Sequence, residues 1–209
     1  MSGSMRLEVR APARARRSQA ERSAAMRARI IEAVVATIGE VGFQRTTASE
    51  ITRRAGVTWG AVQHHFGHKD GILAAVLEDS FGRFAARVID LPGDAPVEER
   101  VALFVDRAWQ HFASPHYRST FEILLSQTAE DPEAQPAWQA GMSRAWDGIW
   151  SQLFGDAAAS RRRTRMLQHY TLSVLSGLAC MAMIEGAPPR FQEAELALLK
   201  ETLVRELGH

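Results

Sequence analysis

The chain of 209 residues has few of the residue types that build covalent or metal frameworks. Its one cysteine, Cys180, excludes an intramolecular disulfide and any zinc site made from several cysteines. No run of about eighteen apolar residues is present, so we predict no membrane-spanning helix and no membrane partner. The arginine-containing N-terminus lacks the continuous apolar segment of a secretory signal. Together these absences predict a cytoplasmic protein.

The sequence also lacks the short motifs of common enzyme classes. It contains no G-x-S-x-G, no glycine-rich phosphate loop and no H-E-x-x-H. Cys180 lies in an apolar stretch beside Met181 and Met183, a setting that suits a structural role better than nucleophilic attack. His64 and His65 are adjacent, and adjacent residues of a helix point to different sides, which disfavours a shared metal. We therefore predict no enzymatic activity, no metal site and no cofactor.

Charge is distributed unevenly along the chain. Residues 1–69 contain 12 Lys and Arg against 5 Asp and Glu, whereas residues 70–209 contain 13 against 19. The formal net charge of +1 thus hides a basic N-terminal part and an acidic remainder. A basic part is suited to contact with the phosphates of nucleic acid. The alternative is an ordinary solvated face joined to a disordered basic tail.

Apolar residues recur at three- and four-residue steps along most of the chain, which predicts an all-α fold. We expect residues 1–22 to form a disordered basic extension, whose arginines either follow a DNA backbone or have no specific role. The sequence has no sustained alternation of the kind that a strand needs. Helices are expected at residues 23–41, 48–55, 59–66, 69–88, 97–113, 119–127, 137–154, 161–184 and 192–207.

The segment TASEITRRAGVTWGAVQHHFGHK, residues 47–69, contains two short helices around one glycine. Thr47 and Glu50 have the spacing of a capping box, and Thr58 can cap a second helix. Gly56 can adopt the left-handed conformation that ends the first. A helix, a turn of three or four residues and a second helix is the arrangement that places the second helix in the DNA major groove.

Residues 26–88, and above all the register of residues 46–70, resemble the TetR/AcrR family of bacterial transcriptional regulators. The resemblance implies residues 23–68 as a three-helix, helix-turn-helix DNA-binding domain. Residues 69–209 would form a helical ligand-binding and dimerisation domain, with residues 69–90 as a connecting helix. It further implies a homodimer on a palindromic operator, most often a repressor released by a small hydrophobic or aromatic effector. The alternative is a ligand-independent activator or architectural regulator of the same fold.

The family pattern also assigns contacts to double-stranded DNA. Four positions that match it are expected near phosphates, namely Thr47, Thr58, Gly60 and Lys69. Three positions depart from it and are expected to read the operator, namely Trp59, Gln63 and His64. Gln63 can pair with adenine, Trp59 can cover a sugar or a thymine methyl, and His64 can touch a phosphate. The alternative for Trp59 is packing beneath its own helix.

The C-terminal half offers a candidate effector pocket rich in aromatic residues. Three tryptophans and a methionine recur at four-residue steps and so share one helix face, namely Trp138, Met142, Trp146 and Trp150. The predicted ligand-binding residues are Phe104, Trp109, Phe112, Trp138, Met142, Trp146, Trp150 and Tyr170. Such a wall suits a flat hydrophobic ligand or, through cation–π attraction, a lipophilic cation. The alternative is an ordinary hydrophobic core.

The last two helices are the predicted dimer surface. Small residues at three- and four-residue steps permit close helix approach, and a leucine seam follows on the final helix. The predicted interface residues are Ser173, Ser176, Gly177, Cys180, Leu196, Leu199, Leu203 and Leu207. The alternative for these residues is burial within their own chain.

Overall fold

The computed structural model describes residues 18–130, 137–157, 160–186 and 188–208, and in these ranges it contains helices and no strand. The predicted all-α fold is confirmed. Its elements are α1 (Gln19–Val41), the short 3-10 helix η1 (Phe43–Arg45), α2 (Ala48–Ala55), α3 (Trp59–Phe66), α4 (Lys69–Val88), α5 (Val97–Phe112), α6 (Pro115–Glu130), α7 (Ala137–Phe154), α8 (Arg161–Glu185) and α9 (Gln192–Leu207).

Two helices begin earlier than the sequence pattern predicted, each because of a serine cap. The Ser18 hydroxyl accepts the Glu21 amide at 3.1 Å, and the Glu21 carboxylate accepts the Ser18 amide at 2.7 Å. This capping box starts α1 at Gln19, so residues 19–22 are helical rather than part of an extension. Likewise, the Ser114 hydroxyl accepts the Tyr117 amide at 3.2 Å, and α6 starts at Pro115 instead of residue 119. Residues 1–17, with most of the N-terminal arginines, lie outside the described residues.

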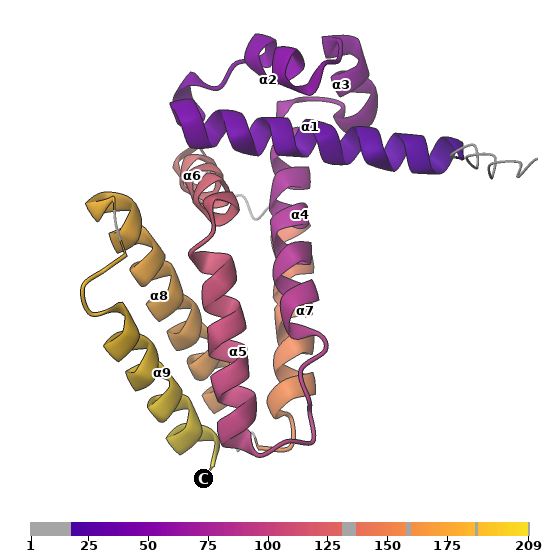
Figure 1. Ribbon diagram of the computed structural model, residues 1–209. Coiled ribbons are helices and arrows are strands. Elements are labelled where there is room, and N and C mark those ends of the chain that lie inside the picture. The colour runs from indigo at the N-terminus through magenta and orange to yellow at the C-terminus, as the bar shows by residue number, and fades with distance from the viewer. Residues whose placement is uncertain (1–17, 131–136, 158–159, 187, 209) are drawn as a thin grey trace, which may run out of the picture.

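Helices α1, α2 and α3 share one hydrophobic core with parts of two later helices. Figure 1 shows α1 lying across the ends of α4 and α6, with α2 and α3 on its other side. The first half of α4 and the side chains of Ile123 and Leu124 of α6 complete this N-terminal core. Its buried members include Ile30, Val34, Ile38, Ile51, Val62, Phe66, Ile72, Val76 and Ile123. We call helices α1, α2 and α3 the N-terminal unit. Its hydrophobic core therefore includes side chains from beyond residue 68.

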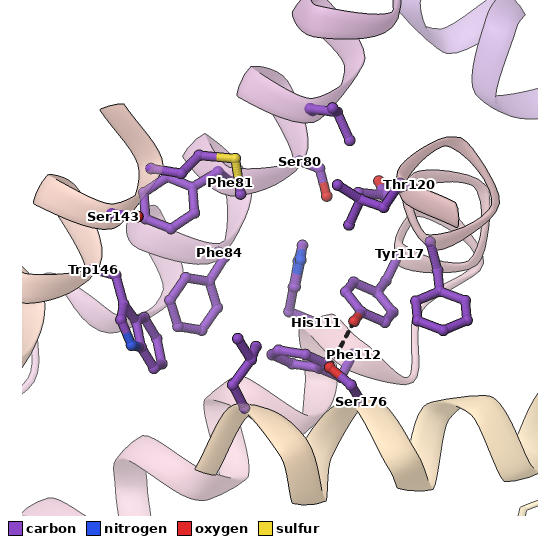
Figure 2. A pocket seen from close by; sticks show the side chains of 15 residues that line it. Ser80, Phe81, Phe84, His111, Phe112, Tyr117, Thr120, Ser143, Trp146 and Ser176 are labelled. Carbon is purple, nitrogen blue, oxygen red and sulfur yellow. Dashed lines mark hydrogen bonds between the residues drawn. The ribbon is translucent and has the colours of Figure 1, made fainter. Parts of the chain in front are cut away.

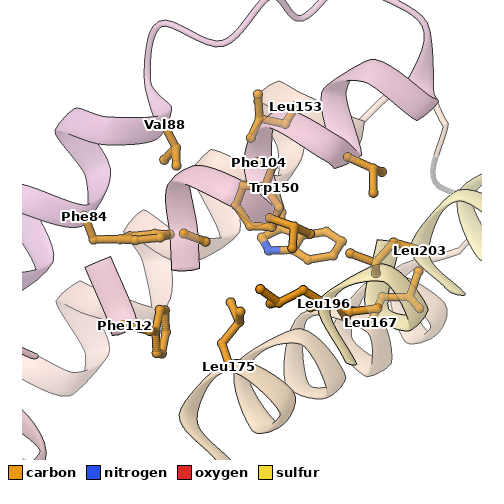
Figure 3. Packing of buried hydrophobic residues seen from close by; sticks show 14 of the residues in the cluster. Phe84, Val88, Phe104, Phe112, Trp150, Leu153, Leu167, Leu175, Leu196 and Leu203 are labelled. Carbon is orange, nitrogen blue, oxygen red and sulfur yellow. The ribbon is translucent and has the colours of Figure 1, made fainter. Parts of the chain in front are cut away.

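A second core fills the space between α5, α7, α8, α9 and the second half of α4 (Figure 3). Phe104 on α5 is fully buried and packs edge-to-face on Trp150 and Phe154 of α7, with ring centroids 5.9 and 5.6 Å apart. Edge-to-face geometry is a favourable arrangement for such rings. Phe104 and Trp150 are thus core residues, which corrects their prediction as ligand contacts.

The leucine seam of α9 belongs to the same core. Leu199 and Leu203 are fully buried, and Leu196 and Leu207 are at most 8% exposed. These four side chains pack against the chain's own second core, so their prediction as dimer contacts was wrong. A stripe at helical spacing marks a face that is buried, but the spacing is the same whether the burying partner is the same chain or another.

Helix α8 keeps an unusually apolar outer face. By length and hydropathy it is the one helix among the described residues that could cross a membrane, and a third of its most apolar window is buried. Core helices of proteins outside membranes meet the same criterion. The exposed fraction of its side chains reaches 72% at Ile184.

The junction between α3 and α4 leaves no room for a side chain at Gly71. A Cβ atom there would lie 2.0 Å from the carbonyl oxygen of Phe66, the last residue of α3. Because the neighbouring atom belongs to the backbone, this steric clash can be relieved only by moving one helix relative to the other. Gly82, on the same helix, has no heavy atom within 4 Å of such a Cβ.

We expect Gly71→Ala to lower the free energy of unfolding by about 1–3 kcal/mol through overpacking against this carbonyl. The matched control, Gly82→Ala, should raise it by about 0.5–1 kcal/mol because alanine has the higher helix propensity. Urea unfolding followed by circular dichroism measures both. Equal stabilities for Gly71→Ala and the wild type would contradict the close approach.

Candidate nucleic-acid interface and ligand cavity

The α2–α3 turn has the local geometry that the sequence predicted. The Thr47 hydroxyl accepts the Glu50 amide at 3.3 Å, and the Thr58 hydroxyl accepts the Ala61 amide at 3.2 Å. Gly56 is left-handed, with φ 61° and ψ 43°. The predicted capping box is only half formed, because the Glu50 carboxylate turns to Arg53 at 2.5 Å and Arg54 at 3.5 Å. This pairing with Arg53 also lowers the pKa of Glu50.

One face of α3 is buried and the other is open. Val62 is fully buried and Phe66 is 9% exposed. All seven predicted DNA contacts, in contrast, are exposed: Thr47, Thr58, Trp59, Gly60, Gln63, His64 and Lys69. Trp59 is 36% exposed and does not belong to the N-terminal core, so it is not packed beneath its helix. The described residues contain no cluster of His, Cys, Asp and Glu able to hold a metal ion.

Contacts from outside the turn fix the ends of α3 and α4. The Arg27 guanidinium of α1 donates to the carbonyl of His65 at 2.8 Å and lies 4.5 Å from the centre of the Phe66 ring. The Lys69 ammonium lies 5.2 Å from the centre of the Phe43 ring. Both are cation–π contacts. Arg27 was not predicted to have this role, because an arginine on a basic helix has the same sequence pattern as any solvated charge.

A cavity of about 360 Å³ lies among helices α4 to α8 (Figure 2). Its lining residues are Leu77, Ser80, Phe81, Phe84, His111, Phe112, Tyr117, Thr120, Phe121, Leu124, Met142, Ser143, Trp146, Leu172 and Ser176. Pockets for small molecules have this size and this mostly apolar character. Among the described residues, its lining contains no Asp, Glu, Lys or Arg.

The cavity contains only part of the predicted ligand site. Phe112, Met142 and Trp146 line it. Trp109 is half-buried against the second core, and Tyr170 is 37% exposed on α8, away from the lining. The side chain of Trp138 lies outside the described residues. Phe81 and Phe84 of α4 and Tyr117 of α6 also line the cavity and were not predicted to do so. For Tyr117 the reason is that the helix of residues 119–127 was expected to begin after it.

His111 is the most polar group at the centre of the cavity wall. Its ring meets Phe84, Phe112 and Tyr117 edge-on, with centroids 5.6, 5.8 and 5.6 Å away. Burial lowers the pKa of His111 to about 4, with a further contribution from the positive charges of His116, Arg87 and Arg83. The imidazole is therefore neutral at pH 7. The hydroxyls of Tyr117 and Ser176 are hydrogen-bonded to each other at 3.0 Å, as Figure 2 shows.

Helix α6 lies between the cavity and the N-terminal unit. Tyr117, Thr120, Phe121 and Leu124 line the cavity, while its other face meets α1 and η1. There the Ser119 hydroxyl donates to the carbonyl of Val35 at 3.0 Å. The Glu122 carboxylate accepts the Phe43 amide at 2.8 Å, directly beside the residue on which Lys69 rests.

Helix α4 makes the second connection. Asp79 accepts from Arg83 at 2.7 Å and lies 3.3 Å from the imidazole of His116 on α6. Arg83 also pairs with Glu32 on α1, and so α1, α4 and α6 are joined by one polar network. The burial of His116 lowers its pKa.

The predicted dimer residues of α8 divide between two faces. Ser176 faces the cavity, which corrects its prediction as an interface residue, whereas Ser173 and Gly177 are exposed and Cys180 is half-buried. An exposed stripe at three- and four-residue steps runs along the outer face: Met166, Tyr170, Ser173, Gly177, Met181 and Ile184. Leu198 of α9 is 59% exposed.

Comparisons with known proteins agree with this architecture. Residues 30–76 match the family model described as "Bacterial regulatory proteins, tetR family". The HTH-type transcriptional regulator BetI of Burkholderia lata is 29% identical over 171 residues, 82% of this chain and 74% of that protein. BetI of Burkholderia ambifaria is 27% identical over 162 residues, 78% of this chain and 70% of that protein.

Solved structures share the fold at lower identity. The fatty acid degradation regulator FadR from Bacillus halodurans superposes with a TM-score of 0.63 at 18% identity, covering 87% of this chain and 93% of that one. The TetR-family regulator PfmR from Thermus thermophilus gives 0.62 at 18% identity, covering 85% and 97%. The multidrug binding protein EbrR complexed with imidazole gives 0.59 at 18% identity, covering 84% and 88%.

The helix-turn-helix geometry, the family match over α1 to α4 and the likeness to curated regulators over most of the chain lead to one assignment. The chain belongs to the TetR family of transcriptional regulators, and α2 and α3 form its DNA-binding helix-turn-helix.

Proposed function

We propose that this chain is a cytoplasmic homodimeric repressor, which leaves a palindromic operator when a small aromatic molecule enters the cavity. The observation that carries the proposal is the position of the cavity. Its wall includes α4 and α6, and both helices also contribute side chains to the N-terminal core. A ligand that displaces either helix therefore acts on the unit that holds α3. The cavity favours this function over a ligand-independent activator or architectural regulator.

Operator recognition is assigned to the open face of α3. Trp59, Gln63 and His64 are exposed on it and would face the major groove. The caps at Thr47 and Thr58 and the absent side chain of Gly60 would let the backbone approach phosphates. Lys69, held against Phe43, would supply a charged phosphate contact.

Gln63→Ala should weaken binding to an operator selected from a random DNA pool by about 1–3 kcal/mol, through loss of a base contact, with little effect on random duplex. Lys69→Ala should weaken both DNAs alike and reduce the salt dependence of binding by about one ion. Fluorescence anisotropy at several salt concentrations measures both. Gln110→Ala, on the distant α5, is the matched control. Equal losses on both DNAs for Gln63→Ala would remove it from the readout.

A dimer surface is assigned to the exposed apolar stripe of α8 together with Leu198 of α9. The stripe combines large side chains such as Met181 and Ile184 with Gly177, which lets a second helix approach closely. Two helices from each subunit would form a four-helix bundle. This surface replaces the buried leucine seam of α9 and explains why so apolar a helix face is exposed.

Met181→Asp combined with Ile184→Asp should convert the dimer to monomers, because paired interfaces do not tolerate unpaired buried charge. Ile89→Asp is the matched control, since Ile89 is 62% exposed at the end of α4 and outside this surface. Sedimentation velocity gives the oligomeric state, and circular dichroism shows that each variant is folded. A double variant that sediments like the wild type would exclude this surface.

Transmission of ligand binding from the cavity to the N-terminal unit is assigned to α6. A ligand pressing on Thr120, Phe121 and Leu124 would shift the opposite face of the helix, where Ser119 and Glu122 hold α1 and η1. The shift would favour a separation of the two recognition helices that misfits successive major grooves.

Glu122→Ala should reduce the coupling between effector and operator by about 0.5–2 kcal/mol, while operator binding without effector is largely retained. Arg118→Ala is the control, because it removes the 3.5 Å ion pair with Glu122 but leaves the hydrogen bond to Phe43. The measurement is operator affinity with and without an effector found by screening aromatic compounds of different charge. Unchanged coupling in Glu122→Ala would show that the signal takes another route.

A further inference from the structure

We propose that the cavity selects an uncharged aromatic molecule with one hydroxyl group, whose ring packs among the phenylalanines and Trp146 while the hydroxyl donates to His111. This inference deepens the proposed effector function, on which it rests, by naming the chemical class of the ligand. Four features of the cavity support it: its lack of charge, its aromatic walls, its free hydrogen-bonding groups and the sign of the nearby charges.

The lining offers no partner to a charged ligand. None of its side chains is acidic or basic apart from the neutral His111. The carboxylate of Asp79 lies outside the lining and is already engaged with Arg83 and His116. Burying an unpaired charge is costly, whether the ligand is a carboxylate or an ammonium.

The aromatic walls fit a flat ring system. Figure 2 shows Phe81, Phe84 and Trp146 gathered on one side of His111, and Tyr117 on the other. Phe84 lies 5.9 Å from Phe81 and 5.4 Å from Trp146, measured between ring centroids. Rings in such tilted clusters pack well against a further aromatic ring.

The hydrogen-bonding groups of the cavity wall differ in whether they already have a partner. The hydroxyls of Ser80 and Ser143 make no hydrogen bond to any of the described residues. Tyr117 and Ser176 satisfy each other, and Thr120 donates to the carbonyl of His116 at 3.1 Å. The ring nitrogens of His111 have no hydrogen bond to any of the described residues, although the residue is only 6% exposed. A neutral imidazole has one nitrogen that accepts, and a hydroxyl donor is the complementary group.

The surrounding charges act against a cationic ligand. The groups that lower the pKa of His111 include Arg83 and Arg87 on α4, and these two guanidinium charges would repel an ammonium in the same place. Cation–π attraction to the rings would have to overcome this repulsion without help from a carboxylate in the lining.

The test uses the full chain at pH 7 and four compounds of one shape: 4-phenylphenol, biphenyl, biphenyl-4-carboxylate and (biphenyl-4-yl)trimethylammonium. Isothermal titration calorimetry without DNA gives each affinity. We expect 4-phenylphenol to bind about 2- to 12-fold more tightly than biphenyl, the increment of one hydrogen bond. The carboxylate and the ammonium should bind at least about tenfold more weakly than the phenol because their charges are unpaired. Tightest binding by either charged compound, or no binding by any, overturns the inference.

Variants of His111 test whether the ligand hydroxyl donates to this side chain. His111→Phe keeps an aromatic ring and should abolish the preference for 4-phenylphenol over biphenyl, whereas His111→Gln should restore part of it. His169→Phe, at an exposed histidine of α8 outside the cavity lining, should leave the preference unchanged. A His111→Phe protein that folds, as judged by circular dichroism, and retains the full preference contradicts the proposed contact.

A separate anisotropy measurement with operator DNA distinguishes this inference from the proposed function. Binding with the expected preference but without DNA release supports the ligand class and contradicts effector-controlled release. Failure of all four compounds to bind overturns the ligand class and leaves the predictions for Gln63 and for the α8 surface standing.

Discussion

The contact between α6 and α1 is the constraint on which the rest of the molecule depends. It is made by two hydrogen bonds, from Ser119 to the carbonyl of Val35 and from the Phe43 amide to Glu122, and by the burial of Ile123 in the N-terminal core. Because α6 also lines the cavity, the contact makes the shape of the cavity and the position of the helix-turn-helix mutually dependent. Without it the N-terminal unit would be attached to the body by α4 alone.

The N-terminal unit and the cavity differ in the charges that they contain. Some cations in or next to the N-terminal unit are held in place by aromatic rings, as Lys69 and Arg27 are, and others are paired with acids, as Arg53 and Arg54 are. The cavity, in contrast, contains no formal charge and holds its one histidine neutral. The DNA-binding helix-turn-helix and the uncharged cavity thus lie on one chain in regions of different chemistry.

The sequence was sufficient for the local parts of this structure. Periodicity predicted α4, α7 and α9 to the residue, and the roles of Thr58 and Gly56 followed from cap and turn chemistry. The sequence did not predict which surface packs against each buried helix face. The leucines of α9 and the tryptophans of α7 both recur at helical spacing, yet the leucines pack in the chain's own core and Trp146 faces the cavity. His111, central to the cavity, had no distinguishing sequence signal, because a lone histidine on an apolar helix has several possible roles.

Because the N-terminal core is shared with α4 and α6, a biosensor cannot be built from this protein by exchanging residues 1–67 alone for the DNA-binding part of another regulator. A DNA-binding part cut at Gly67 would leave behind Ile72, Val76 and Ile123, and with them part of its own interior. The unit that can be transplanted intact includes the first half of α4 and a matching surface on α6. In this protein the DNA-binding unit is therefore contiguous in sequence, but its hydrophobic core is shared with later helices.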